Sequence, residues 1–294
     1  MTVLLATTGG GKSLLKWHMA ANHLMYGKNV LYITMEMAEE EIGRRIDANI
    51  MDITMDEVNE IPRDVYDKRL ARYKTKTTGK LIIKEYPTGS VHSGHFRHLL
   101  NELEMKKNFK PDVIFLDYLN ICASSRVRGA AAASSYNLVK SIAEEVRGLA
   151  MEYNCAVVTS SQFNRDGYGN SDVDLTNTSE SMGITHTADC ILGLVTSEQL
   201  DELGQLMLKQ LKNRWGDLGY YRRFLVGIDR AKMKIYELEE SAQNNVNLDE
   251  GSGGGSGKKM KSYDDDGPVF DKTDIGMRLK GKRKGQVFSD AQLT

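Results

Sequence analysis

The chain has 294 residues, of which 40% are hydrophobic and 27% are charged, and its formal net charge is −1. This composition is typical of a soluble globular protein with one large or two small domains, and any nucleic-acid binding must come from local basic loops. No apolar run approaches the ~20 residues needed to cross a bilayer, and no secretory signal precedes the first predicted strand. The three cysteines are too far apart for a CxxC zinc site or a disulfide framework, so we expect a cytoplasmic protein.

The start of the chain contains a glycine-rich segment between a short apolar run and an amphipathic one. Val3–Leu5 predicts a buried strand, and Lys12-Ser13 opens a predicted helix that extends to about Lys28. The segment between them matches the phosphate-binding loop pattern, with Ala6 where the first glycine usually stands. Glycines let backbone N–H groups face an anion, and the helix N-terminus adds partial positive charge.

We therefore predict a nucleoside triphosphate site with Mg²⁺ at this loop. Lys12 can reach the β- and γ-phosphates, and Ser13 can ligate Mg²⁺. The alternative is a glycine-rich turn that binds no nucleotide. The predicted binding residues are Ala6, Thr8, Gly9, Gly10, Gly11, Lys12, Ser13 and, at the end of a later apolar run, Asp117.

Apolar runs then alternate with helical segments up to about residue 160. The predicted strands cover 29–35, 81–86, 112–118 and 156–160, and the predicted helices cover 38–50, 55–75, 95–105 and 136–153. Four closely spaced strands follow at 190–196, 206–211, 224–229 and 233–238. The pattern predicts an α/β fold with a mostly parallel twisted sheet, helices on both faces and an antiparallel extension. Ligands of such sheets bind at the carboxyl ends of the strands.

The end of the chain differs in composition from the rest. Residues 251–257 read GSGGGSG, and the charged segment beyond them has no apolar face. We predict one domain over 1–245, a Gly/Ser-rich linker over 246–257, and a charged tail over 258–294 that is disordered when free.

Three polar side chains stand where apolar strands end. Asp117 ends DVIFLD, which is how a Mg²⁺-orienting aspartate is presented beside a phosphate loop. Glu36 follows LYITM and could orient or deprotonate an attacking water, or it could only stabilise the start of the next helix. Gln162 follows the strand at 156–160, where its amide could sense the γ-phosphate or simply occupy a turn.

The chain resembles the RecA-type motor domain of hexameric replicative DNA helicases (the DnaB-like family), and it is especially similar to the primosomal helicases of T-even bacteriophages. The matching stretches, in order, are LLATTGGGKS, VLYITMEMAEEEIGRRIDAN, VIFLDYLNICASSR, IAEEVRGLAMEYN, NTSESMG, LMLKQLKNRWGD and GIDRAKMKIYELEESAQ. The resemblance implies a RecA-like P-loop NTPase core that uses ATP and Mg²⁺.

The resemblance also implies roles for individual residues. Glu36 becomes the catalytic base, and Lys212 and Arg214 look like the basic pair that reaches a neighbouring subunit's ATP. Without the family, that pair is the tip of a solvated hairpin. Two loops, at about 124–135 and 164–183, should line a central channel and bind the phosphate backbone of DNA. The implied DNA-binding residues are Arg126, Arg128, Arg165, Glu180, Ser181 and Gly183. Ordinary surface charge is the alternative for Arg126 and Arg128.

The implied function is an ATP-driven hexameric ring that moves 5′ to 3′ on single-stranded DNA and unwinds the duplex ahead. Primase, the helicase loader and the replicative polymerase are the implied partners. Family members carry an N-terminal domain and a linker helix ahead of the motor, and we expect this chain to be the motor without them. A RecA-type recombinase that forms filaments without unwinding is the alternative, although LKNRWG and ITMEM favour the helicase. A non-catalytic ATP-gated clamp would require the base to be missing, and Glu36 is present.

Overall fold

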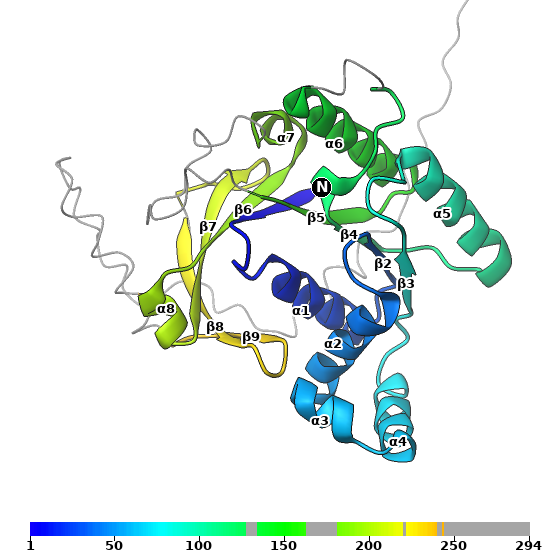
Figure 1. Cartoon of the computed structure of the whole chain (residues 1–294), viewed down its shortest axis with the longest axis vertical. Coiled ribbons are helices and arrows are strands. Elements are labelled where there is room, and N and C mark those ends of the chain that lie inside the picture. Colours follow the sequence, from blue (N-terminus) through cyan, green and yellow to red (C-terminus); the bar gives the residue numbers. More distant parts are fainter. Residues whose placement is uncertain (128–133, 163–180, 220–221, 240–242, 244–294) are drawn as a thin grey trace, which may run out of the picture. The chain divides into compact units, whose positions relative to one another are not determined.

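The computed structural model describes residues 1–127, 134–162, 181–219, 222–239 and 243. All of them lie in Met1–Glu250, the first of two units into which the chain divides. Within the described residues, nine strands form one sheet in the order β3-β2-β4-β5-β1-β6-β7-β8-β9 (Figure 1). Their bounds are β1 Thr2–Ala6, β2 Val30–Thr34, β3 Leu81–Glu85, β4 Val113–Asp117, β5 Ala156–Gln162, β6 Cys190–Val195, β7 Gln205–Asn213, β8 Arg223–Asp229 and β9 Lys234–Glu237.

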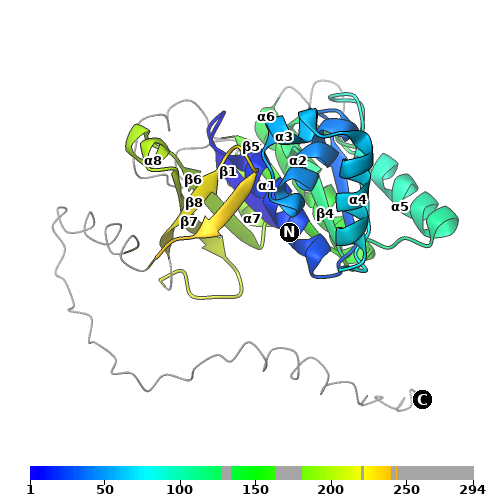
Figure 2. The same cartoon turned by 90° about the horizontal axis from the view of Figure 1, so that it is seen from below.

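Strand direction follows the predicted pattern. All pairings among the first six strands are parallel. The pairings of β6 with β7, β7 with β8 and β8 with β9 are antiparallel. The antiparallel strands continue the sheet on the side away from α5 (Figure 2). The predicted α/β fold with an antiparallel extension is confirmed.

The helices agree with the sequence pattern, apart from two kinds of difference. Their bounds are α1 Lys12–Met25, α2 Glu39–Met51, α3 Met55–Glu60, α4 Arg63–Lys74, α5 Ser93–Lys107, α6 Ser135–Glu152, α7 Ser181–Thr187 and α8 Glu198–Glu202, with a 3-10 turn, η1, at Leu119–Ile121. The helix predicted over 55–75 is two helices, because Ile61 and Pro62 take extended conformations and proline disfavours helix at the residue before it. The short helices α7 and α8 were not predicted, since five to seven residues carry little periodicity.

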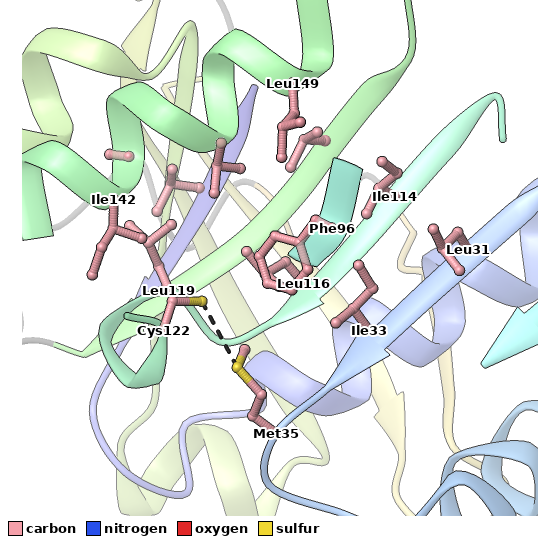
Figure 3. Packing of buried hydrophobic residues seen from close by; sticks show 14 of the residues in the cluster. Leu31, Ile33, Met35, Phe96, Ile114, Leu116, Leu119, Cys122, Ile142 and Leu149 are labelled. Atoms are coloured by element: carbon pink, nitrogen blue, oxygen red, sulfur yellow. Dashed lines mark hydrogen bonds between the residues drawn. The ribbon is translucent and has the colours of Figure 1, made fainter. Parts of the chain in front are cut away.

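The core lies on both faces of the sheet because successive strand residues point to opposite sides. In β1, Val3 and Leu5 belong to a buried cluster shared with α5 and α6, whereas Leu4 and Ala6 belong to one shared with α1 and α2. Figure 3 shows part of the first cluster, in which the Cys122 thiol lies 3.9 Å from the Met35 sulfur. Among the described residues, no helix is long and apolar enough to span a membrane.

Two edges of the sheet matter for the site. The neighbouring strands β2, β4, β5 and β1 are parallel, so their carboxyl ends share one edge, which we call the carboxyl edge. There Ala6 pairs with Gln162, and Thr34 pairs with Asp117. We call the opposite edge the amino edge. β7 ends at the amino edge, because Asn213 pairs with Cys190 and Cys190 pairs with Thr2.

Candidate nucleotide-binding site

A cavity of about 370 Å³ opens at the carboxyl edge. It brings together residues from the loop after β1, the end of β2, the end of β4 and the end of β5. Its lining consists of Thr8, Gly9, Gly10, Gly11, Lys12, Ser13, Leu14, Trp17, Glu36, Arg45, Asp117, Tyr118, Ser160, Gln162, Arg230 and Met233. Every predicted nucleotide-site residue of this chain's own loop and strands is in that set except Ala6, which is buried at the end of β1.

The loop after β1 requires its glycines. Gly11 has φ +85°, a left-handed conformation that other residues adopt only with strain. A Cβ on Gly10 would lie 2.9 Å from the Cβ of Ala6, so the backbone could not pass so close to β1 with a side chain there. Gly11 is also the N-cap of α1 and makes no side-chain capping bond. The first N–H groups of α1 therefore have no cap of this kind and can face an anion.

Lys12 is the first residue of α1, and its side chain reaches back to the start of this loop. Its ammonium donates to the carbonyl oxygens of Ala6 at 2.8 Å and Thr7 at 2.6 Å. Burial and the neighbouring Lys16 ammonium lower the pKa of Lys12 to about 8. Both effects penalise the positive charge, so an anion entering the cavity would stabilise it.

Asp117 is buried at the end of β4 and is held by two partners. One carboxylate oxygen pairs with the ammonium of Lys16, and the other accepts from the Tyr32 hydroxyl at 2.9 Å. Each carboxylate oxygen keeps a further lone pair for a water molecule. Ser13, Glu36 and Asp117 offer hydroxyl and carboxylate oxygens to the same cavity, and Mg²⁺ takes such ligands, so the residues fit this metal.

Glu36 and Gln162 flank the same cavity. Glu36 is exposed, two residues beyond β2, and its backbone N–H donates to Thr34 Oγ1 at 3.3 Å. The strand predicted over 156–160 ends two residues later, at Gln162, so Gln162 is the last residue of β5 and does not follow it. The longer strand arises because 161–162 continue the pairing with β1.

Several residues of the cavity were missed by the sequence reasoning. Trp17 and Arg45 come from α1 and α2, and the Arg45 guanidinium lies 5.1 Å from the centre of the Trp17 ring. Arg230 and Met233 come from the turn between β8 and β9. These residues come from two helices and a distant turn, so no local sequence pattern pointed to them.

Lys212 and Arg214 lie at the amino edge, and the described lining of the cavity does not include them. Lys212 donates to the Thr185 carbonyl at 2.5 Å, and Arg214 donates to Asp189 at 2.7 Å. Arg147 of α6 donates to the same carboxylate oxygen at 2.7 Å. At ~3.3 Å per strand residue, the length of β1 alone separates the two edges by more than about 13 Å. The basic pair is therefore remote from this chain's own phosphate loop.

The candidate DNA-binding residues are only partly described. Arg126 follows β4 and donates to Glu144 at 2.8 Å, and its side chain is 52% exposed. Ser181 starts α7. Gly183 is buried, and a Cβ on it would lie 2.8 Å from the Cβ of Lys140, so close packing of α7 on α6 accounts for this glycine. Arg128, Arg165 and Glu180 lie outside the described residues, as do the predicted linker and tail.

Glu145 of α6 was also missed, and it fixes the base of the loop that starts at Ser124. Its carboxylate accepts from Ser124 Oγ at 2.6 Å, from Ser125 Oγ at 2.7 Å and from Ser93 Oγ at 2.5 Å. Burial alone would raise the pKa of Glu145, but the hydrogen bonds from the three serines outweigh it and lower the pKa to about 2. The carboxylate therefore stays ionised and ties the loop to α5 and α6.

A glycine-rich loop that leads from a central parallel strand into a helix, beside a buried aspartate on a neighbouring strand, defines a P-loop nucleotide-binding protein. Solved structures share the fold. One solved ATPase domain superposes with a TM-score of 0.67 at 16% identity, over 81% of this chain and 84% of that one. A DnaB-like replicative helicase, solved in a study of its interactions with primase, gives 0.66 at 17% identity, over 81% and 57%.

The sequence profile of the DnaB-like helicase C-terminal domain matches residues 1–225, and the chain belongs to this family. The DnaB-like replicative helicase of Enterobacteria phage T4 is 41% identical over 245 residues, which are 82% of this chain and 51% of the relative. A probable plasmid replicative DNA helicase of Chlamydia psittaci is 27% identical over 226 residues, 74% of this chain and 47% of the relative. The chain thus spans about half the length of these relatives. The predicted resemblance is confirmed.

Proposed function

We propose that this chain is the ATP-hydrolysing motor of a replicative DNA helicase. The observation that carries the proposal is the division of the predicted machinery between two edges of one sheet. The carboxyl edge holds Lys12, Ser13, Glu36 and Asp117 around one cavity. The amino edge holds Arg214, more than about 13 Å away by the length of β1. A site that combines the cavity of one subunit with Arg214 of the next accounts for the positions of both.

This division favours a head-to-tail assembly, because each subunit would present a loop on one side and an arginine on the other. Such a heterologous contact closes into a ring or continues as a filament, depending on the rotation between subunits. Family membership and the LKNRWGD segment favour the ring of six. A filament-forming DNA-dependent ATPase is the second candidate, since the same two edges would serve it.

The proposed chemistry follows from the groups around the cavity. Lys12 leaves the carbonyls of Ala6 and Thr7 and donates to the β- and γ-phosphates. Glu36 orients the attacking water and accepts its proton. Mg²⁺, held by Ser13 and through water by Asp117, would neutralise charge on the phosphates. Gln162, next to Ala6 in the sheet, is suited to sense the γ-phosphate.

Arg214 completes the site from the neighbouring subunit. To do so, its guanidinium must leave Asp189 and approach the γ-phosphate, where it stabilises charge that develops in the transition state. Lys212 would act beside it. The channel loops, with Arg126 and Arg128 in the first and Arg165, Glu180, Ser181 and Gly183 in or next to the second, would bind the phosphates of single-stranded DNA.

The proposal extends to direction, partners and chain organisation. We propose 5′ to 3′ movement, and primase, the helicase loader and the replicative polymerase as partners. Residues 1–245 form the motor in this proposal. The segment 246–257 is a linker and 258–294 is a tail that tethers a partner, as their composition suggests.

Strand displacement on forked DNA tests the function. We expect ATP-dependent unwinding of a fork whose single-stranded tail is 5′, and little unwinding when only a 3′ tail is offered. Lys12→Ala, assayed in parallel, should abolish the signal. DNA-stimulated ATP hydrolysis without unwinding, together with filaments in electron micrographs, would favour the second candidate. Lack of nucleotide binding would refute both.

A further inference from the structure

A second lysine lies beneath the cavity and outside its lining. Lys16 follows Lys12 by four residues in α1, so the two side chains share one face of the helix. The Lys16 side chain is fully buried. Its ammonium pairs with one oxygen of Asp117 and donates to Ser160 Oγ at 2.8 Å. A charged residue thus occupies a position that the helix otherwise fills with apolar side chains.

The surroundings of Lys16 explain why the charge can be buried. An ammonium removed from water needs an opposite charge and hydrogen-bond acceptors close by, and Asp117 and Ser160 provide both. The pairing has a consequence for Asp117. Its negative charge, which would otherwise attract a divalent cation, is offset by a cation that cannot leave the protein.

Lys16 also acts on the cavity itself. It is close enough to Lys12 to disfavour that residue's positive charge, so two ammonium groups lie near the phosphate loop. Together they offset the carboxylates of Asp117 and Glu36, so the site without nucleotide has little net negative charge to attract a free metal ion. The phosphates of a nucleotide would reverse this balance, because they bring more negative charge than the lysines offset.

We propose that Lys16 is a positioning residue of the nucleotide site that acts as a fixed counter-cation. It neutralises Asp117 while the cavity lacks phosphates, so a divalent metal enters together with the nucleotide and not before it. The inference deepens the proposed function and rests on it, since it assumes a Mg²⁺–nucleotide complex in this cavity. Lys16 adds to the positive charge that Lys12 and the metal would supply.

The proposal predicts that Lys16 changes the coupling between metal binding and ADP binding. Without Lys16, ADP loses one fixed cation, whereas the metal gains an uncompensated aspartate. In EDTA, the Lys16 variants should therefore bind ADP more weakly than the wild type. With Mg²⁺ present, their loss of ADP affinity should be smaller or absent. The ratio of the two dissociation constants should rise about tenfold or more for one unit charge near a divalent ion. A residue with only a packing role would change both constants alike.

The experiment measures ADP binding by calorimetry, with Mg²⁺ and with EDTA, for the wild type, Lys16→Met and Lys16→Gln. Lys28→Met is the matched control, because Lys28 lies just beyond α1 with an exposed side chain that pairs with Asp112 at 3.9 Å. The glutamine variant keeps a hydrogen-bond donor for Asp117, and it decides the question if thermal denaturation shows that Lys16→Met does not fold. Electron paramagnetic resonance of Mn²⁺ gives a second reading, in which the Lys16 variants without nucleotide should bind Mn²⁺ more tightly than the wild type.

The counter-cation role is supported if the ratio of the ADP dissociation constant in EDTA to that in Mg²⁺ is larger in the Lys16 variants than in the wild type. The same ratio should be at its wild-type value in Lys28→Met. A ratio unchanged in a folded Lys16 variant overturns it, as does Mn²⁺ binding no tighter than in the wild type. Failure of the wild type to bind ADP under either condition would refute the proposed function instead. The two failures are therefore distinguishable.

Discussion

The two edges of the sheet differ in how their charged groups are arranged. At the carboxyl edge, lysine, serine and carboxylate groups converge on a cavity that can receive a nucleotide. At the amino edge, Arg147 and Arg214 both donate to the carboxylate of Asp189, so two cations share one anion. At the cavity, Lys12 has to give up only two neutral carbonyl oxygens, whereas Arg214 must release a carboxylate before it can bind a phosphate. In the proposed assembly, catalysis would depend on that exchange.

Removing Arg214 should have the largest effect. We expect Arg214→Ala to lower ATP hydrolysis by about 10³–10⁵-fold, because an arginine finger acts on charge present only in the transition state. The affinity for ADP should change little, since the cavity of the same chain remains intact. Arg222→Ala, which removes an exposed arginine just before β8, is the control and should hydrolyse ATP normally. Near-normal hydrolysis by Arg214→Ala would show that the amino edge takes no part in catalysis.

Mixed assemblies sharpen the same comparison. A Lys12→Ala subunit keeps a working amino edge, and an Arg214→Ala subunit keeps a working carboxyl edge. Each homogeneous variant should be nearly inactive, but a mixture should recover measurable ATP hydrolysis at interfaces that join the two intact edges. If mixed assemblies form, as judged by native mass spectrometry, and no activity returns, then Arg214 does not act on a neighbour's ATP.

At the carboxyl edge, a substitution of Glu36 should affect ATP hydrolysis without affecting ATP binding. Glu36→Gln keeps the size and polarity of the side chain but cannot accept a proton as a base. We expect hydrolysis to fall by about 10²–10⁴-fold, with ATP and DNA affinities close to wild type. Single-turnover hydrolysis and equilibrium binding measure the two properties separately. Wild-type turnover in Glu36→Gln would exclude this residue as the base.

The sequence predicted the carboxyl edge better than the amino edge, for a physical reason. Asp117 ends an apolar run, Glu36 directly follows one, and Gln162 lies two residues beyond the strand predicted at 156–160. The ends of neighbouring parallel strands meet at one edge, so local patterns were sufficient. The pair of Lys16 with Asp117 joins residues 101 positions apart, and that of Arg214 with Asp189 joins residues 25 apart. Such partners depend on strand order and register, which no local pattern contains. The strand ends were predictable, and the charges that compensate them were not.

Glu145 tests how firmly the carboxyl edge holds its loop. We expect Glu145→Gln to lower the free energy of unfolding at pH 7 by about 2 kcal/mol, because a buried acceptor of several hydrogen bonds loses its charge. Its pKa is lowered from 4.5 to about 2 on folding, so this stabilisation is complete above pH 4.5 and is lost as the pH falls toward 2.

Urea unfolding at pH 7 and pH 3.5 checks that expectation. The difference in the free energy of unfolding between wild type and Glu145→Gln should shrink by about 1 kcal/mol at the lower pH. Glu144→Gln is the matched control, since Glu144 is 40% exposed and its ion pair should contribute less than about 1 kcal/mol. Equal effects of the two substitutions would remove the special role of Glu145.

The smallest expected effect concerns Arg126, which repeats at the carboxyl edge the situation of Arg214 at the amino edge. It is paired with a carboxylate, Glu144, at 2.8 Å and must release it to bind a DNA phosphate. Replacing Arg126 and Arg128 with Ala should weaken single-stranded DNA binding and reduce its salt slope by about 1.4, at about 0.7 per phosphate contact. Glu144→Gln should act in the opposite direction and tighten binding at low salt, because the arginine no longer needs to exchange partners.

Fluorescence anisotropy of labelled oligonucleotides across a salt series measures both effects, and DNA-independent hydrolysis should change little. If the slope is unchanged in the double alanine variant, both arginines are ordinary surface charges and the loop at 124–135 does not bind DNA through them.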